Sequence, residues 1–512
     1  MNSRLSNISR NVVWGFLGKA ISLLLPFISR TVMISYIGME YVGLNSLFVS
    51  VLQVLSVAEL GVGAALVFSM YKPLAEGNTK EICALLNLYK KTYRIIGILI
   101  LTGGVIVTPF ISNFIKGDVP QDLNIYIIFC IYVANSVLGY FLCSYRQSLL
   151  IASQRVDILS KITLLIQIFI GVSQIFVLVF FRSFLLFVII LPITTILNNI
   201  LVALITVKLF PQYKCIGKIS SNEFSDIKKQ VCGMAFQKLG GIVLFSVDTL
   251  VISSFLGLVP LALYQNYYFV FLGVNSFFQV IQQVLIPSVG NSIASNSVDK
   301  NYGFFKKLNF VYIWLVILVS CYLICLYQPF ITIWIGKENL LDEYLMLLFV
   351  AYFFVFKWCD MLYVFQEATG IWWETRFIPS AAAFLNLILN FTLVKYIGLA
   401  GILISTIVSV LFIYNIFSAK ILFKSYFSSI VSGCMYFWKS QIKFFAIAFV
   451  CIFVCYCLSK IILSSSLLNQ VLINIVICTV LPNLILYAIT RRSDEFQYVI
   501  GVVKTRVAKI LH

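Results

Sequence analysis

The stretch Asn11–Ile37, NVVWGFLGKAISLLLPFISRTVMISYI, decides how the rest of the chain is interpreted. It is long and apolar enough to cross a bilayer, yet it contains two cations, Lys19 and Arg30. The two lie 11 residues apart, which at ~100° per residue places both on one face of a helix. A cation at bilayer depth is costly and marks a functional site by default. We therefore expect this face to contact protein or a water-filled cavity and not lipid.

The composition of the whole chain indicates a polytopic membrane protein. Of its 512 residues 61% are hydrophobic and 11% are charged, and the mean hydropathy is +1.00. A soluble protein of this length needs more charge to cover its surface. The net charge of +18 does not indicate nucleic acid, because the basic residues are dispersed between apolar runs, as the positive-inside rule expects. The 13 cysteines show no paired spacing, so neither a disulfide framework nor a metal site is predicted.

Apolar runs long enough to span a bilayer recur along the chain and predict an all-α protein with fourteen transmembrane helices. The predicted spans are residues 12–36, 41–69, 94–115, 123–150, 158–181, 184–207, 233–257, 261–289, 309–335, 343–368, 376–394, 399–419, 442–463 and 467–490. Lys and Arg concentrate in alternate connections, which predicts that both termini face the cytoplasm. The opposite loops hold only Lys116, Arg182, Lys337, Lys395 and Lys460.

The chain also repeats itself at an offset of 219–220 residues. The matched pairs include Lys19 with Lys238, Gly38 with Gly257, and Pro109-Phe110-Ile111 with Pro329-Phe330-Ile331. Spans 1–6 and 7–12 are therefore predicted to form two similar bundles, related by a pseudo-two-fold axis along the membrane normal with a cavity between them. This is the layout of transporters that work by alternating access.

The repeat divides the chain into five predicted segments. They are residues 1–207 as the first six-helix bundle, 208–232 as a cytoplasmic amphipathic linker, 233–420 as the second bundle, 421–490 as helices 13 and 14, and 491–512 as a basic cytoplasmic tail. Residues 208–230 mix Lys with apolar side chains and are expected to form an amphipathic helix on anionic lipid headgroups. The tail has a similar pattern, and a merely solvated basic segment is the alternative for it.

Charges inside the spans provide the candidate site. Lys19, Arg30 and Lys238 are predicted to line a cationic cavity for an anionic headgroup, since Arg matches phosphate geometry and Lys acts as a point charge. Asp248 falls one position from the repeat equivalent of Arg30, which predicts an Arg30–Asp248 pair that gates the outer side. The alternative is a permanent ion pair between the halves, with both lysines extended toward the inner interface.

Further polar residues inside the spans have two interpretations each. Glu59, Asp248 and Asp360 are candidates for a gate or for a coupling proton or sodium ion, although Asp360 is expected to be neutralised by Lys357, three residues before it. Asn386 and Asn390 lie on one helix face and could bond a glycan or a neighbouring helix, and packing is the stronger interpretation.

An enzyme is not predicted. The one histidine is His512, so His-based catalysis and His metal sites have no basis, and no Walker A loop is present. No cofactor and no metal are expected. A membrane polysaccharide polymerase is the enzyme alternative, but it needs a sizeable extramembrane loop with paired carboxylates or arginines, and the external loops are too short to supply one.

Four motifs carry a resemblance. They are AELGVGAA at 58–65, IG…YVGL at 37–44, SVDTLVI at 246–252 followed by Gly257, and Asn386…Asn390 leading to KYIGLAG at 395–401. As an ordered set they resemble the polysaccharide-transport branch of the multidrug/oligosaccharidyl-lipid/polysaccharide (MOP) flippase superfamily.

The resemblance implies a MATE-like fold, a V-shaped cavity with a cationic lining, and a lipid-linked substrate. That substrate is an oligosaccharide repeat unit on undecaprenyl diphosphate, moved from the cytoplasmic to the external leaflet of the bacterial cytoplasmic membrane for O-antigen (lipopolysaccharide) or capsule assembly. A polysaccharide polymerase and a chain-length regulator are the protein partners it implies. A cation-coupled multidrug exporter and a flippase for lipid II or a teichoic-type precursor are the alternatives.

Overall fold

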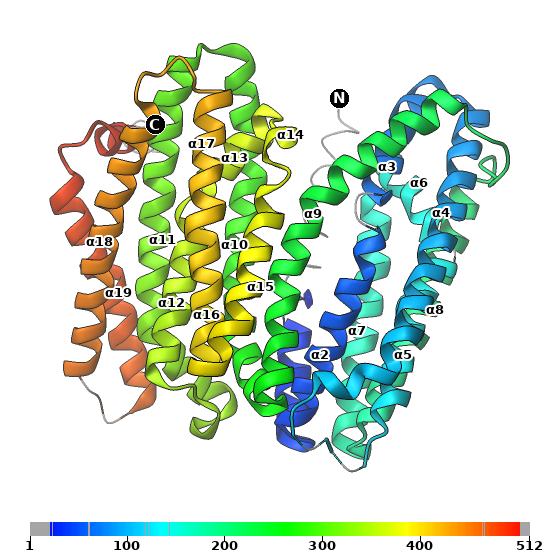
Figure 1. The fold of residues 1–512 in the computed structure, drawn as a ribbon, viewed down its shortest axis with the longest axis horizontal. Helices are drawn as coiled ribbons and strands as arrows, with labels where there is room; N and C mark the ends of the chain where they lie inside the picture. Colours follow the sequence, from blue (N-terminus) through cyan, green and yellow to red (C-terminus); the bar gives the residue numbers. More distant parts are fainter. Residues whose placement is uncertain are drawn as a thin grey trace, which may run out of the picture. The chain divides into compact units, whose positions relative to one another are not determined.

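The structure is a computed structural model that describes residues 21–501, except positions 23, 60, 61, 118, 121, 143, 463 and 465. Its regular elements are all helical, and no strand occurs among these residues. Figure 1 labels the helices in chain order, after a first apolar helix that includes Leu24–Tyr36.

The first part of the chain forms α2 (Met39–Leu55), η1 (Ser56–Glu59), α3 (Val62–Glu76), α4 (Thr79–Val107), η2 (Thr108–Phe114), α5 (Ile125–Phe141), η3 (Ser144–Arg146), α6 (Gln147–Ala152), α7 (Val156–Phe181), α8 (Phe184–Leu209) and α9 (Ser221–Leu256). The remainder forms α10 (Leu258–Ser295), α11 (Val298–Ile335), η4 (Lys337–Asn339), α12 (Glu343–Trp358), α13 (Asp360–Thr369), α14 (Trp372–Thr375), α15 (Ile378–Ile397), α16 (Leu399–Val408), the π-helical η5 (Ser409–Asn415), α17 (Ile416–Ser425), α18 (Gly433–Ile461) and α19 (Leu467–Thr490).

The predicted all-α membrane fold is confirmed. Eleven helical segments in the described part of the chain are long and apolar enough to cross a membrane, and three shorter apolar helices accompany them. The shorter ones are Leu24–Tyr36, Met39–Leu55 and Ile125–Phe141. Together these segments correspond to the fourteen predicted spans, so the chain is a multi-pass membrane protein.

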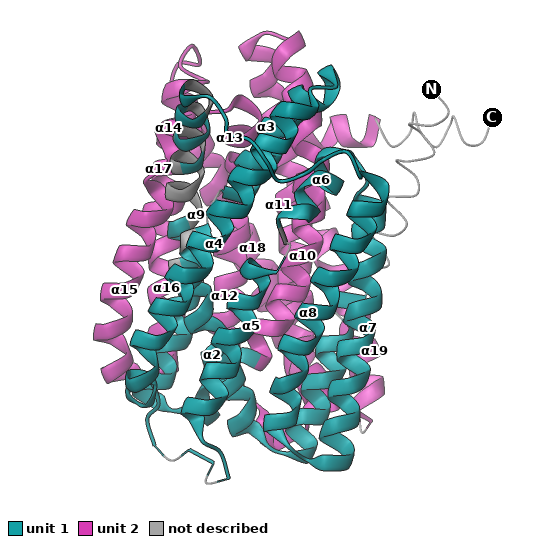
Figure 2. Ribbon diagram, turned by 90° about the vertical axis from the view of Figure 1, so that its right-hand side faces the viewer, with its two compact units in different colours: residues 1–265 teal, residues 266–512 magenta. Residues whose placement is uncertain are grey.

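The chain forms two compact units, residues 1–265 and 266–512, which are coloured separately in Figure 2. Within the first unit α4 packs on α5, α5 on α8, and α8 on α7, while α9 packs on α2 and α3. Within the second, α11 packs against α12, α18 and α19. The predicted segment boundaries, which follow the sequence repeat, stay a prediction.

The sequence repeat also appears in the backbone conformation of matched glycines. Gly38 precedes α2 with a φ of 112°, and Gly257 precedes α10 with a φ of 102°. Gly117 and Gly336, at the same offset of 219, have φ values of 89° and 92°. A positive φ is a conformation that residues with a Cβ rarely adopt, so the same turns recur where the same residue does.

One predicted element is wrong. Residues 210–220 form no helix, and α9 begins only at Ser221 and continues through the seventh span, so no separate amphipathic helix occupies 208–230. Pro211 lacks a backbone donor and Gly217 has a φ of 93°, and both disfavour a helix here. This segment, residues 210–220, is called the α8–α9 loop below.

The start of the C-terminal tail packs on the protein. Residues 494–501 are helical, and the Phe496 ring is buried and stacks on Trp314 of α11 with a centroid distance of 5.7 Å. The solvated-tail alternative therefore does not hold for the residues around Phe496. Residues 502–512 lie outside the described part of the chain.

Candidate functional site

Arg30 lies in the first apolar helix and is half-buried in the first compact unit. Its Nη2 donates a hydrogen bond to the carbonyl oxygen of Ala262, in the second turn of α10, at 3.5 Å. The neighbouring Ser29 is buried, so this stretch of the helix packs against protein. The helix therefore contacts protein at Ser29 and Arg30, and the polar face predicted for the whole helix stays a prediction.

Asp248 lies on α9 in the same unit, with 3% of its surface exposed. The residues around it fix α9 in place: Ser246 Oγ donates to Gln53 Oε1 of α2 at 3.2 Å. Gln265 Nε2 of α10 donates to Thr249 Oγ1 at 2.9 Å. An Arg30–Asp248 pair would therefore form inside one compact unit and would not join two. Its gating role stays a prediction.

Two of the three predicted cavity cations cannot be placed. Lys19 lies outside the described residues, and of Lys238 only the backbone, in α9, is described. The cationic cavity that includes both lysines with Arg30 stays a prediction.

Glu59 ends η1, where the second span is interrupted between α2 and α3. Its carboxylate accepts hydrogen bonds from the hydroxyls of Tyr93 on α4, at 2.8 Å, and Tyr140 on α5. Tyr89, one turn before Tyr93, donates to the Tyr93 hydroxyl at 3.0 Å and stacks on its ring. Sequence reasoning assigned Glu59 to a gate but missed the tyrosines, although the i,i+4 spacing of Tyr89 and Tyr93 places them on one helix face.

Asp360 begins α13, directly after the interruption that separates α13 from α12. The predicted pair with Lys357 is present, with Nζ 2.8 Å from Oδ2 and 3% of the lysine side chain exposed. The same oxygen accepts hydrogen bonds from the Tyr312 hydroxyl and from Gln282 Nε2, both at 2.5 Å. A buried charge is tolerated when it is paired and hydrogen-bonded, and this arrangement meets both conditions.

Removing the lysine of this pair should destabilise the protein strongly. Lys357→Met leaves the Asp360 carboxylate buried without its cation, which costs about 3–5 kcal/mol in comparable cases. We expect a clear fall in the thermal unfolding temperature of the purified protein. The double variant Lys357→Met/Asp360→Asn should recover most of the loss, because no unpaired charge remains. Equal destabilisation of the single and double variants would contradict the ion-pair argument.

Asn386 and Asn390 are both fully buried in α15. Asn390 Nδ2 donates to Asn386 Oδ1 at 2.9 Å, and Asn386 Nδ2 donates to Thr406 Oγ1 of α16 at 2.9 Å. The Asn386–Thr406 bond connects the two helices, and the Asn390–Asn386 bond within α15 supports it, which is the contact that the packing interpretation expects. A glycan contact stays a prediction.

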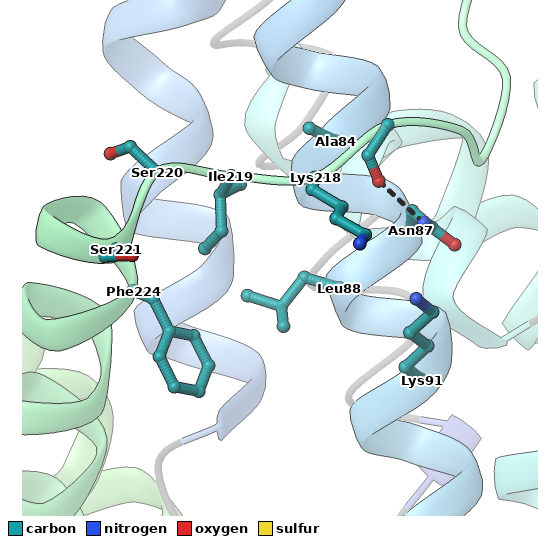
Figure 3. A pocket seen from close by; sticks show the side chains of 10 residues that line it. Ala84, Asn87, Leu88, Lys91, Lys218, Ile219, Ser220, Ser221 and Phe224 are labelled. Carbon is teal, nitrogen blue, oxygen red and sulfur yellow. Dashed lines mark hydrogen bonds between the residues drawn. The ribbon is translucent and has the colours of Figure 1, made fainter.

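A cavity of about 320 Å³ lies between the N-terminal half of α4, the α8–α9 loop and the start of α9 (Figure 3). Lys91 and Lys218 project toward it with Leu88 and Phe224. Asn87 Nδ2 donates to the Gly217 carbonyl at 2.8 Å, and the Lys214 backbone N–H contacts Cys83 Sγ at 3.3 Å. The loop is thus held on α4 by contacts to its backbone.

The rate at which the Cys215 thiol is alkylated should report how firmly the α8–α9 loop is held on α4. Burial raises the pKa of the Cys215 thiol, and the Tyr145 hydroxyl and the charges of Arg146 and Lys90 only partly oppose it. Because the thiolate is the reacting form, alkylation should be slow at neutral pH and accelerate as pH rises.

Asn87→Ala should release the loop and speed alkylation of Cys215 about fivefold, the equivalent of one hydrogen bond of about 1 kcal/mol. The rate is measured by mass spectrometry of the peptide that contains Cys215. Lys91→Ala, which changes the same cavity but not the loop contacts, is the control. Identical rates in both variants would show that the Asn87 bond does not hold the loop.

A second cavity, of about 430 Å³, lies in the other unit among α11, α18 and the residues after α19. Lys306, Lys443 and Glu495 line it together with aromatic rings. Neither cavity contains a candidate metal site. Among the residues whose positions are described, no cluster of three His, Cys, Asp or Glu side chains could hold a metal ion.

No protein-family model and no curated protein matches this sequence. Solved structures do match. An inward-facing multidrug resistance MATE family transporter of the MOP superfamily has a TM-score of 0.60 at 11% identity, over 82% of this chain and 95% of its own. The lipid II flippase MurJ, in an inward closed conformation, has a TM-score of 0.61 at 14% identity, over 94% and 98% of the two chains. The Vibrio cholerae MATE transporter VcmN, in a mutant form, has a TM-score of 0.57 at 12% identity, over 83% and 99%.

The fold is that of the MATE and MurJ transporters. The expected MATE-like fold is therefore confirmed. The match to MurJ covers more of this chain than either match to a MATE transporter, although all three known chains are covered almost completely. At these identities the likeness concerns the fold, and the substrate has to be argued from the residues.

Proposed function

We propose that this protein is a flippase for undecaprenyl-diphosphate-linked oligosaccharide repeat units. It would move them from the cytoplasmic to the external leaflet of a bacterial cytoplasmic membrane by alternating access, for O-antigen, capsular or another surface polysaccharide. The observation that carries the proposal is Arg30, a cation within a membrane helix that is held against α10 by the Ala262 carbonyl in a chain with the MOP transporter fold.

The physical problem of this substrate explains why a cation is needed. A diphosphate-linked glycan cannot cross a hydrocarbon layer of about 30 Å unaided. A polar, positively charged path removes that barrier for the headgroup, while the polyprenyl chain stays in lipid. Arg30, with Lys19 and Lys238 as further candidates, would supply two or three charges. That number is enough to attract a diphosphate without trapping it.

Two features support a flippase over a drug exporter. The polysaccharide-transport motifs are distributed over most of the chain, from Ile37 to Gly401. In addition, the flippase MurJ matches 94% of this chain, whereas the two MATE transporters match 82% and 83%. Helices α18 and α19, which follow the two predicted bundles, would then contribute to handling the lipid part of the substrate.

In this proposal the protein is a transporter and not an enzyme, both of its termini face the cytoplasm, and it binds no cofactor. A polymerase and a chain-length regulator would act on the delivered units, and anionic lipids would contact the basic cytoplasmic segments. Transport would be coupled to a proton or a sodium ion, for which Glu59, Asp248 and Asp360 are the candidates.

Complementation of a mutant blocked in repeat-unit export is the direct test. Expression of this chain should restore surface polysaccharide, detected on intact cells. Two parallel strains address the alternatives: one lacking its lipid II flippase, and one lacking its main drug exporters. Rescue of either of these strains without restored polysaccharide would overturn the proposal in favour of the corresponding alternative.

A further inference from the structure

The second cavity, of about 430 Å³, lies where three membrane helices reach the boundary between hydrocarbon and water. It is formed by the N-terminal parts of α11 and α18 and by the residues that follow α19, and these helices pack side by side in the second unit (Figure 1). The corresponding predicted spans begin at residue 309, begin at 442 and end at 490. The lining residues fall in 302–310, 436–444 and 490–495, so they cluster at these three span ends. The volume is in the range of small-molecule sites, about 300–1,000 Å³.

One part of the cavity wall carries hydrogen-bond donors and positive charge. Lys306 of α11 and Lys443 of α18 line it, and neither forms an ion pair with a described acidic side chain. Asn309, one turn after Lys306, also lines the cavity and is 5% exposed. Its Oδ1 accepts from Gln441 Nε2 at 3.2 Å, so its Nδ2 is the end of the amide that can donate to a ligand. Two ammonium groups and an amide donor suit a phosphate group.

A carboxylate in the same wall distinguishes this cavity from a simple anion site. Glu495 is held there by the next residue, Phe496, whose buried ring stacks on Trp314 at 5.7 Å. No described lysine or arginine forms an ion pair with Glu495. A carboxylate in the wall would repel a purely anionic ligand. The first cavity is the contrasting case, because Lys91 and Lys218 line it without a described acidic side chain.

Two tyrosines lie in the wall together with the carboxylate. Tyr302 belongs to α11, and the exposed Tyr436 belongs to α18. Both rings already attract cations of the protein, since the Lys306 ammonium lies 5.4 Å from the Tyr302 ring centre and the Lys439 ammonium lies 6.0 Å from that of Tyr436. Aromatic rings beside a carboxylate are suited to an organic ammonium group, which gains a cation–π contact and a charge-assisted hydrogen bond.

We propose that this cavity binds the headgroup of a zwitterionic phospholipid with a primary ammonium group, as in phosphatidylethanolamine. The phosphate would contact Lys306, Lys443 and Asn309 Nδ2, and the ammonium would contact Glu495 and the tyrosine rings. The acyl chains would lie in the bilayer along α18, where Val450, two turns beyond Lys443 on the same helix face, is exposed. The inference goes beyond the proposed transport function and does not depend on the glycan.

The charges of the cavity predict which phospholipids it selects. Phosphatidylglycerol offers the same phosphate but no cation, so it would leave the Glu495 carboxylate without a partner. Phosphatidylcholine offers a cation without an N–H, so it cannot donate a hydrogen bond to that carboxylate. A hydrogen bond between charged groups is worth about tenfold in affinity. Phosphatidylethanolamine should therefore bind about tenfold more tightly than either of the other two lipids.

A bound lipid would also connect elements that are far apart in the sequence. Its headgroup would contact α11, α18 and the segment after α19 at once, so it would hold the last two membrane helices against the rest of the second unit. Because a ligand that binds only the folded state stabilises it by mass action, phosphatidylethanolamine should raise the thermal unfolding temperature more than phosphatidylglycerol does.

The test is native mass spectrometry of the purified full-length protein in detergent, with the three phospholipids added in equal amounts and with identical acyl chains. The wild type should carry one phosphatidylethanolamine in preference to the others. Glu495→Gln should remove the preference over phosphatidylglycerol, and Lys443→Gln should lower the occupancy by both lipids. Lys91→Gln, which removes a lysine from the first cavity, is the matched control and should change neither.

Equal occupancy by phosphatidylethanolamine and phosphatidylglycerol in the wild type would overturn the proposal, and this comparison needs no variant to fold. An unchanged preference in Glu495→Gln would also overturn it. Soluble phosphoethanolamine has no acyl chains and should compete only weakly. Displacement of the lipid by an equal concentration of phosphoethanolamine would show that the occupant is a soluble compound and would refute the lipid. Since the samples contain no glycan, the result is independent of the export assay.

Discussion

Replacing Arg30 by alanine should abolish export of the lipid-linked glycan while leaving the protein in the membrane. The guanidinium is the described cation that we place on the substrate path, and it is fixed by the Ala262 carbonyl. Loss of one charge from a desolvated phosphate contact costs about 2–5 kcal/mol, which is roughly 30-fold or more in affinity. Surface polysaccharide of the complemented export mutant should fall to the background of the empty strain.

Three variants separate binding from packing. Arg30→Lys should retain part of the activity, because it keeps the charge but loses the bidentate geometry. Lys72→Ala, a change of an exposed lysine with 84% of its side chain accessible, should export normally. The exchange Arg30→Asp/Asp248→Arg tests the alternative role. Restored export in the exchanged protein would show that Arg30 acts mainly in an ion pair and not on the substrate.

The second large effect is expected at Gly43, in the second turn of α2. A Cβ added here would lie 2.2 Å from the carbonyl oxygen of Leu258, the first residue of α10. The obstacle is backbone, so it cannot rotate away as a side chain can, and α2 and α10 would have to separate. Overpacking costs about 1–3 kcal/mol where side chains can adjust, and we expect Gly43→Ala to reach or exceed the upper end. The measurement is the thermal unfolding temperature of the purified protein.

Gly139→Ala is the matched control. Gly139 also lies in a membrane helix of the first unit, α5, and an added Cβ would meet no atom within 4 Å. Alanine has a higher helix propensity than glycine by about 1 kcal/mol, so this variant should unfold at the same or a higher temperature. Equal behaviour of the two variants would contradict the close approach of α2 and α10.

Much of the fold follows from the sequence because the bilayer imposes it. Apolar runs long enough to cross a bilayer predicted the membrane-spanning helices. Matched glycines such as Gly38 and Gly257 indicated the sequence repeat, and both glycines have a positive φ in the structure. The interruptions were not predictable in this way. The runs around Glu59 and Cys359 remain apolar, and hydrophobicity alone does not distinguish a continuous helix from a broken one.

The site was predictable only in part. Charged residues within apolar runs can be recognised from the sequence alone, as Glu59 and Asp360 were. The i,i+3 spacing of Lys357 and Asp360 was also enough to predict their ion pair. The hydroxyl partners come from other helices, and tyrosines in a membrane protein are usually assigned to interfacial belts. Only the packing of α4 and α5 against η1 identifies Tyr93 and Tyr140 as ligands of a carboxylate.

The burial of the thiols where α11, α18 and α19 meet makes the second unit a favourable background for spin labelling. Cys321 and Cys325 of α11, Cys451 and Cys455 of α18, and Cys478 of α19 are all buried among apolar neighbours. Nitroxide reagents should therefore spare these five native sulfurs, which can stay in place. The half-buried Cys434 and Cys457 of α18 would be replaced before engineered label pairs follow the motion of each helix.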